Sequence, residues 1–445
     1  MSLPLKMGLL VINCLEWSES MSDFLTMGEL KHKTLKEIYK YARQFKISYY
    51  SQMNKKELSL AVLRAQAKKQ GFVSMAGVLE VVSGEGFGFL RPINYGPSQE
   101  DIYISASQIR RFELRTGDRV VGRARPPKAN EHYYGLMHVD TVNGKDPETA
   151  KQRPHFPALT ALYPQEKMTL TTTPQRLAPR LIDLFAPVGF GQRGLIVAPP
   201  KAGKTSLLKA VANGIAQNYP DAYLIVLLID ERPEEVTDIE RSVNGEVVYS
   251  TFDQQPANHT RVAELVLERA ERLVEGKQDV VILLDSITRL TRAYNLTTPS
   301  SGRTLSGGLD PAAFYRPKRF FGAARNIEEG GSLTILATAL VDTGSRMDDV
   351  IYEEFKGTGN LELHLSRELS ERRIFPALDI KQSGTRKEAL LLAKPDLDVL
   401  WQIRRSMRGD ALGYTEELLR LLKRTKTNAG FLRQLKRKLA RNSQH

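Results

Sequence analysis

The spacing of apolar residues changes twice along the chain and divides it into three regions. Between residues 28 and 72, apolar side chains recur at helical spacing, which is typical of amphipathic helices. Between residues 73 and 147, apolar and polar positions alternate, and Gly, Pro and Ser separate the alternating stretches. From residue 181 to residue 445, continuous apolar runs alternate with helical patterns. This order predicts a small N-terminal helical domain, a β domain and an α/β domain.

The alternating region, 73–147, contains five short stretches that are expected to be strands: 77–82, 87–91, 101–104, 119–125 and 135–142. Five strands of this length predict a small β-barrel of the OB or cold-shock type. Residues 148–180 are rich in Pro and Thr and are expected to be a linker. Residues 1–27 are expected to be a tail, either disordered or added by a start codon read too far upstream.

The last region, 181–445, is expected to be a doubly wound α/β domain. Its apolar runs indicate parallel strands that are buried on both faces: 195–197, 223–229, 279–284 and 333–340. The stretch 414–445 has helical spacing and nine Lys or Arg against two Glu, which predicts basic C-terminal helices. The expected fold class is therefore multidomain, α+β in the N-terminal part and α/β in the remainder.

The first apolar run leads into Gly-Leu-Ile-Val-Ala-Pro-Pro-Lys-Ala-Gly-Lys-Thr-Ser, residues 194–206, and a helical pattern follows. A strand, a loop of this length, Gly-Lys-Thr and a helix are together the context of a P-loop, although Ala198 replaces the first glycine. The backbone amides of the loop would hold phosphate oxygens, and Lys204 would supply a positive charge to the β- and γ-phosphates. The Thr205 hydroxyl would bind Mg²⁺. The alternative is a coincidental surface loop, which the flanking strand and helix disfavour. We expect a RecA-like ATPase domain that binds ATP and Mg²⁺ through loop residues: Lys201, Ala202, Gly203, Lys204, Thr205 and Ser206.

Two carboxylates follow neighbouring strands at the edge of the sheet where a P-loop lies. Asp285 ends the run 279–284 and is expected to hold Mg²⁺, and capping of the next helix is the alternative. Glu231 follows the run 224–229 and is expected to polarise the attacking water, and a solvated loop or helix N-terminus is the alternative. Phosphoryl transfer also needs a cation near the γ-phosphate, and spacing alone does not choose among four arginines: Arg289, Arg367, Arg373 and Arg386.

An aromatic pair marks the second expected strand of the barrel, in Gly-Glu-Gly-Phe-Gly-Phe-Leu-Arg at 84–91. Phe87 and Phe89 share one face at a period of two, and the glycine between them lets the sheet pack closely. Beside Arg91, this pair predicts a platform on which unpaired bases stack. The alternative is a Phe pair in the barrel core. Nearby basic residues and tyrosines favour nucleic-acid binding.

Two polar loops of the expected ATPase domain carry one arginine each, Arg303 within 300–308 and Arg346 within 342–348. Either these loops are solvated connectors, or they line a channel and grip a nucleic-acid backbone during ATP turnover. The residues alone leave both interpretations open.

Composition points to an anionic partner and excludes several kinds of site. The chain carries 64 Lys and Arg against 51 Asp and Glu, and residues 28–150 hold more than half of the formal charge of +13. This charge favours nucleic acid as a partner, and a solvated basic surface is the alternative. Cys14 is the only cysteine, which excludes an internal disulfide and a thiolate metal site. No apolar run reaches the about 18 residues that span a bilayer, so we expect a cytoplasmic protein without a membrane partner.

These motifs together resemble the bacterial transcription termination factor Rho family. The resemblance runs from about residue 28 to the C-terminus and includes, besides the barrel motif, five segments: 198–205, 228–237, 283–290, 316–326 and 356–360. It implies a homohexameric ring that loads onto unstructured, C-rich RNA and uses ATP to translocate from 5′ to 3′. It also implies that the ring unwinds RNA–DNA hybrid and dislodges RNA polymerase, so that transcription terminates.

The resemblance further implies roles at the ATP site. Glu231 would be the hydrolytic base, Asp285 the Mg²⁺ partner, and Arg386 a finger that reaches the ATP of the neighbouring subunit. Phe375 would stack on the adenine, and Arg232 would lie within the nucleotide site.

For RNA, the resemblance implies a primary pyrimidine pocket of seven residues: Phe87, Phe89, Arg91, Asp101, Tyr103, Glu131 and Tyr133. Arg303 and Arg346 would lie in two RNA loops of a central channel, where members of the family often have Lys. Ser206 also departs from the family, because a larger apolar residue often packs near the base at this position. The first 27 residues have no counterpart in the resemblance.

Two other hypotheses compete with this one. The first is another ring ATPase of the RecA-like class, such as a rotary ATP synthase subunit or a DNA helicase, for which a pyrimidine pocket has no use. The second is an RNA-binding protein that uses nucleotide only as an assembly switch, for which a water-activating base such as Glu231 is unnecessary.

Overall fold

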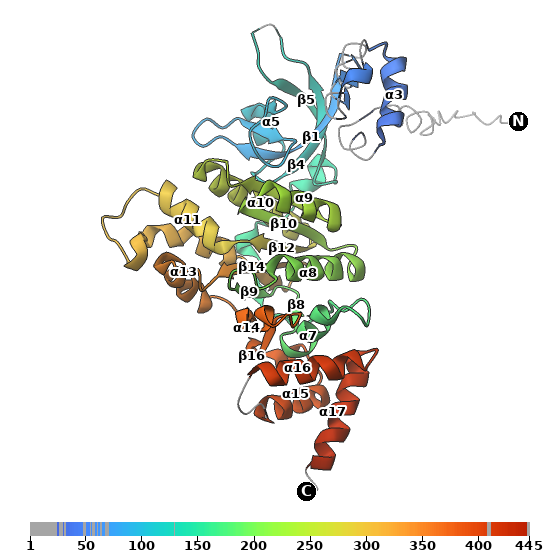
Figure 1. The fold of residues 1–445 in the computed structure, drawn as a ribbon. Helices are drawn as coiled ribbons and strands as arrows, with labels where there is room; N and C mark the ends of the chain where they lie inside the picture. The colour runs from blue at the N-terminus through green and yellow to red at the C-terminus, as the bar shows by residue number, and fades with distance from the viewer. Residues whose placement is uncertain are drawn as a thin grey trace, which may run out of the picture. The chain divides into compact units, whose positions relative to one another are not determined.

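The computed structural model describes residues 25, 30, 33–47, 50–53, 55, 58, 59, 61, 62, 65, 66, 71–128, 130–406 and 411–442. The chain divides into two units (Figure 1). The first unit contains the residues up to 93 with 97–115 and 119–151, and the second contains 94–96, 116–118 and the chain from 152 onward. The tail expected over 1–27 lies, apart from Leu25, outside the described residues.

The helical part of the first unit contains α3, Leu35–Gln44, whose N-terminus carries a capping box. The Thr34 hydroxyl accepts from the Glu37 amide at 3.4 Å, and the Glu37 carboxylate accepts from the Thr34 amide at 2.6 Å. A 3₁₀ turn, η2, covers Tyr50–Gln52. Within the second helix expected over 55–69, the described residues are helical: 55, 58, 59, 61, 62, 65 and 66. The other positions of that helix lie outside the described residues.

The expected β domain is confirmed as a closed barrel of five strands in the order β1-β2-β3-β5-β4. The strands are β1 Val73–Val81, β2 Gly88–Arg91, β3 Ile102–Ile104, β4 Arg119–Arg125 and β5 Tyr134–Val142. Alternate side chains fill the barrel, and Leu90, Ile102 and Val120 among them are fully buried. A short helix that the sequence did not predict, α5 over Ala106–Arg111, follows β3.

Gly88 of β2 lies close against β1. A Cβ atom at Gly88 would lie 2.7 Å from the Glu80 carbonyl oxygen and 2.9 Å from the Leu79 side chain. Only a residue without a side chain fits between the strands, so Gly88 faces inward and the residues on either side, Phe87 and Phe89, face outward.

The second unit is built on a mainly parallel sheet with the strand order β11-β10-β12-β14-β9-β15-β16. The four expected parallel strands are confirmed: β9 Arg193–Ala198, β10 Tyr223–Glu231, β12 Asp279–Asp285 and β14 Ser332–Leu340. The sequence did not predict three further strands: β11 Glu246–Thr251, β15 Leu361–Leu365 and β16 Leu378–Thr385. β16 runs antiparallel to β15.

Helices connect these strands, and Figure 1 shows α8 on one side of the strands and α11 and α13 on the other. The α-helices are α7 Leu177–Phe185, α8 Lys204–Asn218, α9 Pro233–Ser242, α10 Pro256–Glu275, α11 Ile287–Thr297, α12 Tyr315–Gly322, α13 Arg346–Lys356 and α14 Arg367–Glu371. The 3₁₀ turns are η4 Ser306–Gly308, η5 Pro311–Phe314 and η6 Glu388–Leu390. The second unit thus has the doubly wound α/β architecture that the sequence predicts for it.

The segment expected to be a linker, 148–180, is folded, and from residue 152 onward it belongs to the second unit. It contains the end of α6 Pro147–Ala150, then η3 Phe156–Ala158, β6 Ala161–Leu162, β7 Lys167–Met168 and the start of α7. β6 pairs with β13, Arg325–Ile327, and β7 pairs with β8, Val188–Gly189. Strands of two residues are too short to give a periodic pattern, which is why the sequence indicated a linker.

Three helices follow the sheet: α15 Lys394–Ser406, α16 Ala411–Lys423 and α17 Asn428–Asn442. The fully buried Arg180 of α7 joins them to the ATPase core. Its guanidinium donates to the carbonyl oxygens of Leu422 at 2.9 Å and Thr425 at 2.7 Å. Within the described part of the chain, no helix is both long enough and apolar enough to cross a bilayer.

Candidate nucleotide and RNA sites

The phosphate loop joins the carboxyl end of β9 to the N-terminus of α8, as the sequence predicts. Lys201 and Gly203 have φ angles of 64° and 91°, so the loop turns tightly through two left-handed residues. The Ser370 hydroxyl donates to the Lys201 carbonyl oxygen at 2.9 Å and holds the loop from outside. Ala202 of the loop is buried, and α8 begins at Lys204 with its backbone amides available for an anion.

The Lys204 ammonium lies between two buried carboxylates at the carboxyl edge of the sheet. Its Nζ is 2.8 Å from Glu231 Oε1 and 2.5 Å from Asp285 Oδ1. Burial disfavours the charged form of Lys204, but the charges of Asp285 and Glu231 outweigh burial and raise its pKa. The three side chains expected at the reaction centre from distant parts of the sequence therefore meet in space.

Glu231 is 2% exposed and ends β10 after an irregularity at Asp230, whose φ is 59°. Burial raises the pKa of Glu231, and the charge of Asp285 adds to this effect, while Lys204 opposes it. The alternative of a solvated acidic loop is wrong for Glu231. A buried carboxylate with a raised pKa has the properties of a general base.

Asp285 is 1% exposed, and its Oδ1 also accepts a hydrogen bond from the Thr338 hydroxyl at 2.7 Å. The alternative role for Asp285, capping of α11, is wrong because the Ser286 hydroxyl accepts from the Arg289 amide instead. Asp285 and the Thr205 hydroxyl in the first turn of α8 are hard oxygen donors, which suit Mg²⁺. Among the described residues there is no group of three or more His, Cys, Asp or Glu side chains that could hold a metal ion.

The structure separates the four arginines that the sequence left open. Arg289 lies in the site, with Nη1 3.2 Å from Glu231 Oε2, and it donates to the Asp230 carbonyl oxygen. Arg367 pairs with Glu371 at 2.9 Å on the exposed surface of α14. Arg232, expected within the nucleotide site, is exposed at the start of α9 directly after Glu231.

Arg386 and the P-loop of its own chain lie at opposite ends of strand β9. β16 ends at Thr385, which is paired with Leu361, and Leu361 is paired with Gly194 at the beginning of β9. The P-loop follows the other end of β9, about 15–20 Å away at roughly 3.3 Å per residue. Arg386 therefore cannot reach a phosphate bound at its own P-loop.

Phe375 is 48% exposed and forms a wall of a cavity of about 430 Å³ beside the P-loop. Its ring lies 3.8 Å from the position that a Cβ atom of Gly203 would take, and Ser206 lines the same cavity. The residues that line it are Gln175, Leu177, Ala178, Ala202, Gly203, Ser206, Leu207, Leu365, Phe375, Pro376 and Ala377. A planar base fits such a cleft against the Phe375 ring.

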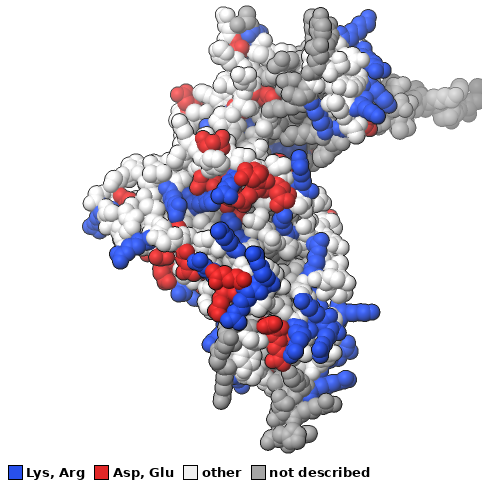
Figure 2. Space-filling model, viewed as in Figure 1, with Lys and Arg blue, Asp and Glu red and all other residues white. Residues whose placement is uncertain are grey.

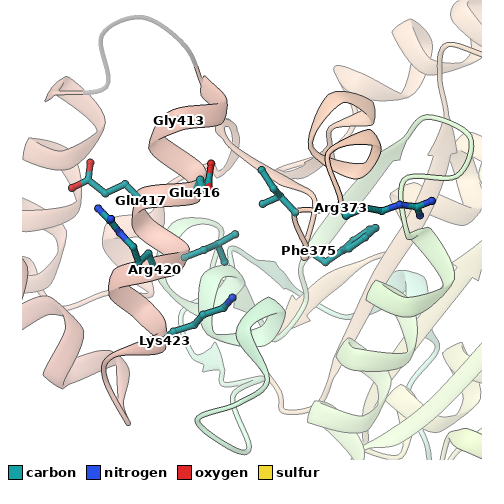
Figure 3. A pocket seen from close by; sticks show the side chains of 9 residues that line it. Arg373, Phe375, Gly413, Glu416, Glu417, Arg420 and Lys423 are labelled. Carbon is teal, nitrogen blue, oxygen red and sulfur yellow. The ribbon is translucent and has the colours of Figure 1, made fainter.

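Phe375 also borders a second and more polar cavity of about 690 Å³, which sequence reasoning did not find (Figure 3). Arg373 lines it on the side of Phe375, and charged side chains of α16 line it on the other side. The α16 residues are Gly413, Glu416, Glu417, Leu419, Arg420 and Lys423. In the sequence these charges are indistinguishable from an ordinary solvated helix face.

On the barrel, four aromatic rings form one outward-facing cluster. The Phe89 ring lies 5.9 Å from Phe87, 6.2 Å from Tyr103 and 5.0 Å from Tyr133, and Phe87 lies 5.5 Å from Tyr103. Tyr103 and Tyr133 are 40% and 39% exposed, and the two phenylalanines are half-buried. The alternative of a Phe pair in the barrel core is wrong, because Leu90 of the same strand occupies the core.

The charged residues expected in the same pocket hold the cluster from beneath and from its rim. Arg91 is 6% exposed, pairs with Asp101 and with Glu80 at 2.8 Å, and lies 5.1 Å from the Phe89 ring centre. At the rim, the Arg125 guanidinium donates twice to Glu131, at 2.5 and 2.8 Å. Hydrogen bonds from Arg125 and from the Lys128 amide lower the pKa of Glu131 to about 2. All seven residues of the expected pocket thus lie in one region of the barrel.

The two arginine loops of the ATPase unit lie against each other. A Cβ atom at Gly307 would lie 2.6 Å from the Met347 amide nitrogen, so the loops touch through their backbones. Arg303 and Arg346 are exposed, and Arg346 begins α13. Next to it, the buried Asp348 accepts from Arg292 at 2.8 and 2.5 Å. The contact between the loops is a finding that the sequence did not predict.

The surface charge in Figure 2 is mixed: Asp and Glu gather at the level of α9 and α10, and Lys and Arg predominate at the level of the C-terminal helices.

Three family models match the chain. They are "Rho termination factor, N-terminal domain" over 29–71, "Rho termination factor, RNA-binding domain" over 75–148, and "ATP synthase alpha/beta family, nucleotide-binding domain" over 179–385.

Relatives match almost the whole chain. Transcription termination factor Rho of Bacillus subtilis (strain 168) is 69% identical over 407 residues, which cover 92% of this chain and 95% of the relative. Transcription termination factor Rho of Aquifex aeolicus (strain VF5) is 55% identical over 425 residues, which cover 94% and 97%. A type III secretion system ATPase of pathogenic bacteria is similar in fold, with a TM-score of 0.54 and 21% identity over 70% of this chain and 94% of that one. This chain belongs to the transcription termination factor Rho family.

Proposed function

We propose that this chain is an RNA-dependent ATPase that translocates on RNA from 5′ to 3′, unwinds RNA–DNA hybrid and terminates transcription. Its family membership supports termination by an RNA-binding ATPase. The observation that carries the proposal is that one chain combines a lysine held between two buried carboxylates with an outward-facing aromatic cluster on a barrel. A rotary ATPase or a nucleotide switch does not need both.

At the ATP site, Lys204 exchanges its two carboxylate partners for the β- and γ-phosphate oxygens when nucleotide binds. Glu231 then lies free of Lys204, and its raised pKa suits it to accept a proton from the attacking water. Thr205 and Asp285 would hold Mg²⁺, which would neutralise phosphate charge. Phe375 stacks on the adenine in the cavity beside the P-loop.

Arg386 lies at the end of the strands opposite to the P-loop, so it cannot act on the nucleotide of its own subunit. We propose that it acts on the nucleotide of a neighbouring subunit. A contact of this kind is heterologous, and heterologous contacts form a ring when the rotation between subunits closes. We therefore propose a homohexamer in which each ATP site receives Arg386 from the next subunit and uses it to stabilise charge on the γ-phosphate.

RNA binds at two places. The aromatic cluster of Phe87, Phe89, Tyr103 and Tyr133 takes unpaired, C-rich RNA, with the acidic and basic groups around it reading base edges. Arg303 and Arg346, on loops that touch each other, grip the backbone in a central channel. The ring moves along nascent RNA in the cytoplasm until it meets the RNA polymerase elongation complex.

Mixed rings test this proposal. Lys204→Ala should abolish ATP turnover, Arg386→Ala should reduce it to a small residual rate, and both should leave binding of short C-rich RNA to the barrel unchanged. Mixing the two variants should restore part of the turnover, because some sites then combine an intact Lys204 with an intact Arg386 from the neighbour. Turnover that never rises above that of the separate variants in any mixture, while each variant assembles normally, would place the arginine elsewhere and refute a ring of shared sites.

A further inference from the structure

Residues 385–387, the last residue of β16 and the two that follow it, are each held by a different contact. The Thr385 hydroxyl donates to the Pro187 carbonyl oxygen at 2.8 Å, and the Arg386 amide donates to the Asn360 carbonyl oxygen at 2.8 Å. The Lys387 ammonium lies 3.4 Å from the centre of the Tyr163 ring. The backbone around Arg386 is thus fixed on both sides, while its own side chain is exposed.

Asn360, which receives the Arg386 amide, is itself tied to the beginning of β9. Its Oδ1 accepts from the Gln192 side chain at 2.6 Å and from the Arg193 amide at 2.9 Å. Its own amide donates to the Arg193 carbonyl oxygen at 2.8 Å. Since the P-loop follows the other end of β9, the backbone that carries Arg386 is connected to its own ATP site through one strand.

Lys387 adopts a backbone conformation that needs support. Its φ is 55° and its ψ is 36°, a left-handed conformation that non-glycine residues seldom take. A cation over the face of a Tyr ring is attracted to it, and this contact is the side-chain anchor of Lys387. Tyr163 comes from the loop after β6 and is 57% exposed, so burial of its ring does not account for its position.

Arg386 also lies close to other positive side chains. A cavity of about 230 Å³ lies beside it, and Tyr163, Arg193, Arg386 and Lys387 are among its lining residues. Burial lowers the pKa of Arg193, and the charges of Arg325 and Arg386 lower it further. Arg193 and Arg386 therefore repel each other beside this cavity, and the Arg386 side chain remains exposed to solvent.

We propose that Tyr163 is a positioning residue for Arg386: by holding Lys387, it sets the direction in which Arg386 leaves the sheet. This inference rests on the proposed action of Arg386 at the ATP site of the neighbouring subunit. A preorganised cation stabilises developing charge without reorganisation, and small misplacements lower the rate steeply.

The test measures kcat and KM for RNA-stimulated ATP hydrolysis by the full-length chain. Tyr163→Leu should lower kcat by about twofold to thirtyfold, the range expected from loss of one cation–π contact, with KM for ATP little changed. Tyr163→Phe keeps the ring face and should behave as wild type. Tyr315→Leu is the matched control, because Tyr315 is an aromatic residue that is 74% exposed and lies outside this contact.

A double variant separates positioning from a structural role. In the Arg386→Ala background, Tyr163→Leu should have no further effect on the residual rate, since there is no guanidinium left to position. A normal kcat for Tyr163→Leu, or a full additional loss of rate in the double variant, would overturn this inference. If Arg386→Ala alone is still impaired, the proposed function of Arg386 would stand in either case. A normal rate for Arg386→Ala alone would remove the proposed function of Arg386 and this inference with it.

Discussion

Replacing Glu231 by Gln removes the proposed base and keeps the size of the side chain. Glu231 is buried, and its carboxylate lies 2.8 Å from Lys204 and 3.2 Å from Arg289. A positioned general base contributes about 10²- to 10⁴-fold to a rate, which corresponds to about 2.7–5.4 kcal/mol of barrier. Glu231→Gln should therefore lower kcat by about this factor. ATP should bind at least as well, because Lys204 loses one of the carboxylates that compete with phosphate.

The pH profile gives this prediction a second part. Burial and the charge of Asp285 raise the pKa of Glu231 above 4.5, so wild-type turnover should decline as pH falls through the raised pKa. Glu231→Gln should lack that acid limb in its residual rate. The assay is single-turnover hydrolysis with saturating RNA, with nucleotide binding measured separately. Glu234→Gln, an exposed residue on α9, is the control and should keep wild-type turnover. A kcat within threefold of wild type for Glu231→Gln would refute the assignment.

Two further predictions concern the barrel and α10. Phe89→Ala should weaken the binding of short C-rich RNA about fivefold to 150-fold, because one lost stack is worth about 1–3 kcal/mol. Met137→Ala is the control and should bind this RNA as wild type does, because Met137 is 59% exposed and lies outside the cluster. Equal affinities of Phe89→Ala and wild type in an equilibrium titration would contradict this prediction. For α10, burial first and the charge of Glu268 second raise the pKa of Glu271 from 4.5 to about 7. Between these two pH values the folded chain keeps a proton on Glu271 that the unfolded chain loses. The contribution of Glu271 to the free energy of unfolding is therefore complete below pH 4.5 and is lost as pH rises through about 7, and the loss is at most about 3 kcal/mol. Glu271→Gln should remove this dependence in urea unfolding between pH 5 and 8, and an identical pH dependence in wild type and variant would exclude it.

The long periodic elements could be predicted from the sequence. The runs that became β9, β10, β12 and β14 are continuous and apolar because both faces of a parallel sheet are covered. The alternation at Phe87, Gly88, Phe89 and Leu90 correctly indicates an outer aromatic face, although composition alone could not tell that face from the core. Polar residues that end buried strands, Glu231 and Asp285, converge because parallel strands end at one edge.

What the sequence could not give depends on contacts between distant segments. Thr338, which donates to Asp285, left only the weak signal of a hydroxyl inside an apolar run. β15 and β16 alternate too briefly and contain charged residues, so their place beside β9 was not predictable, and with it the place of Arg386. The pairing of Lys387 with Tyr163 joins residues whose sequence positions give no sign of each other.

The central claim is that RNA on the barrel controls ATP hydrolysis at the P-loop. The most direct test is ATP turnover by the full chain alone and with poly(C), poly(U), poly(A) or single-stranded DNA, in wild type and in Phe89→Ala. Strong stimulation by poly(C), little by DNA, and a shift to higher RNA concentration in Phe89→Ala are the results that we predict. Turnover that is the same with and without RNA would contradict the claim and leave the aromatic cluster without a role in catalysis.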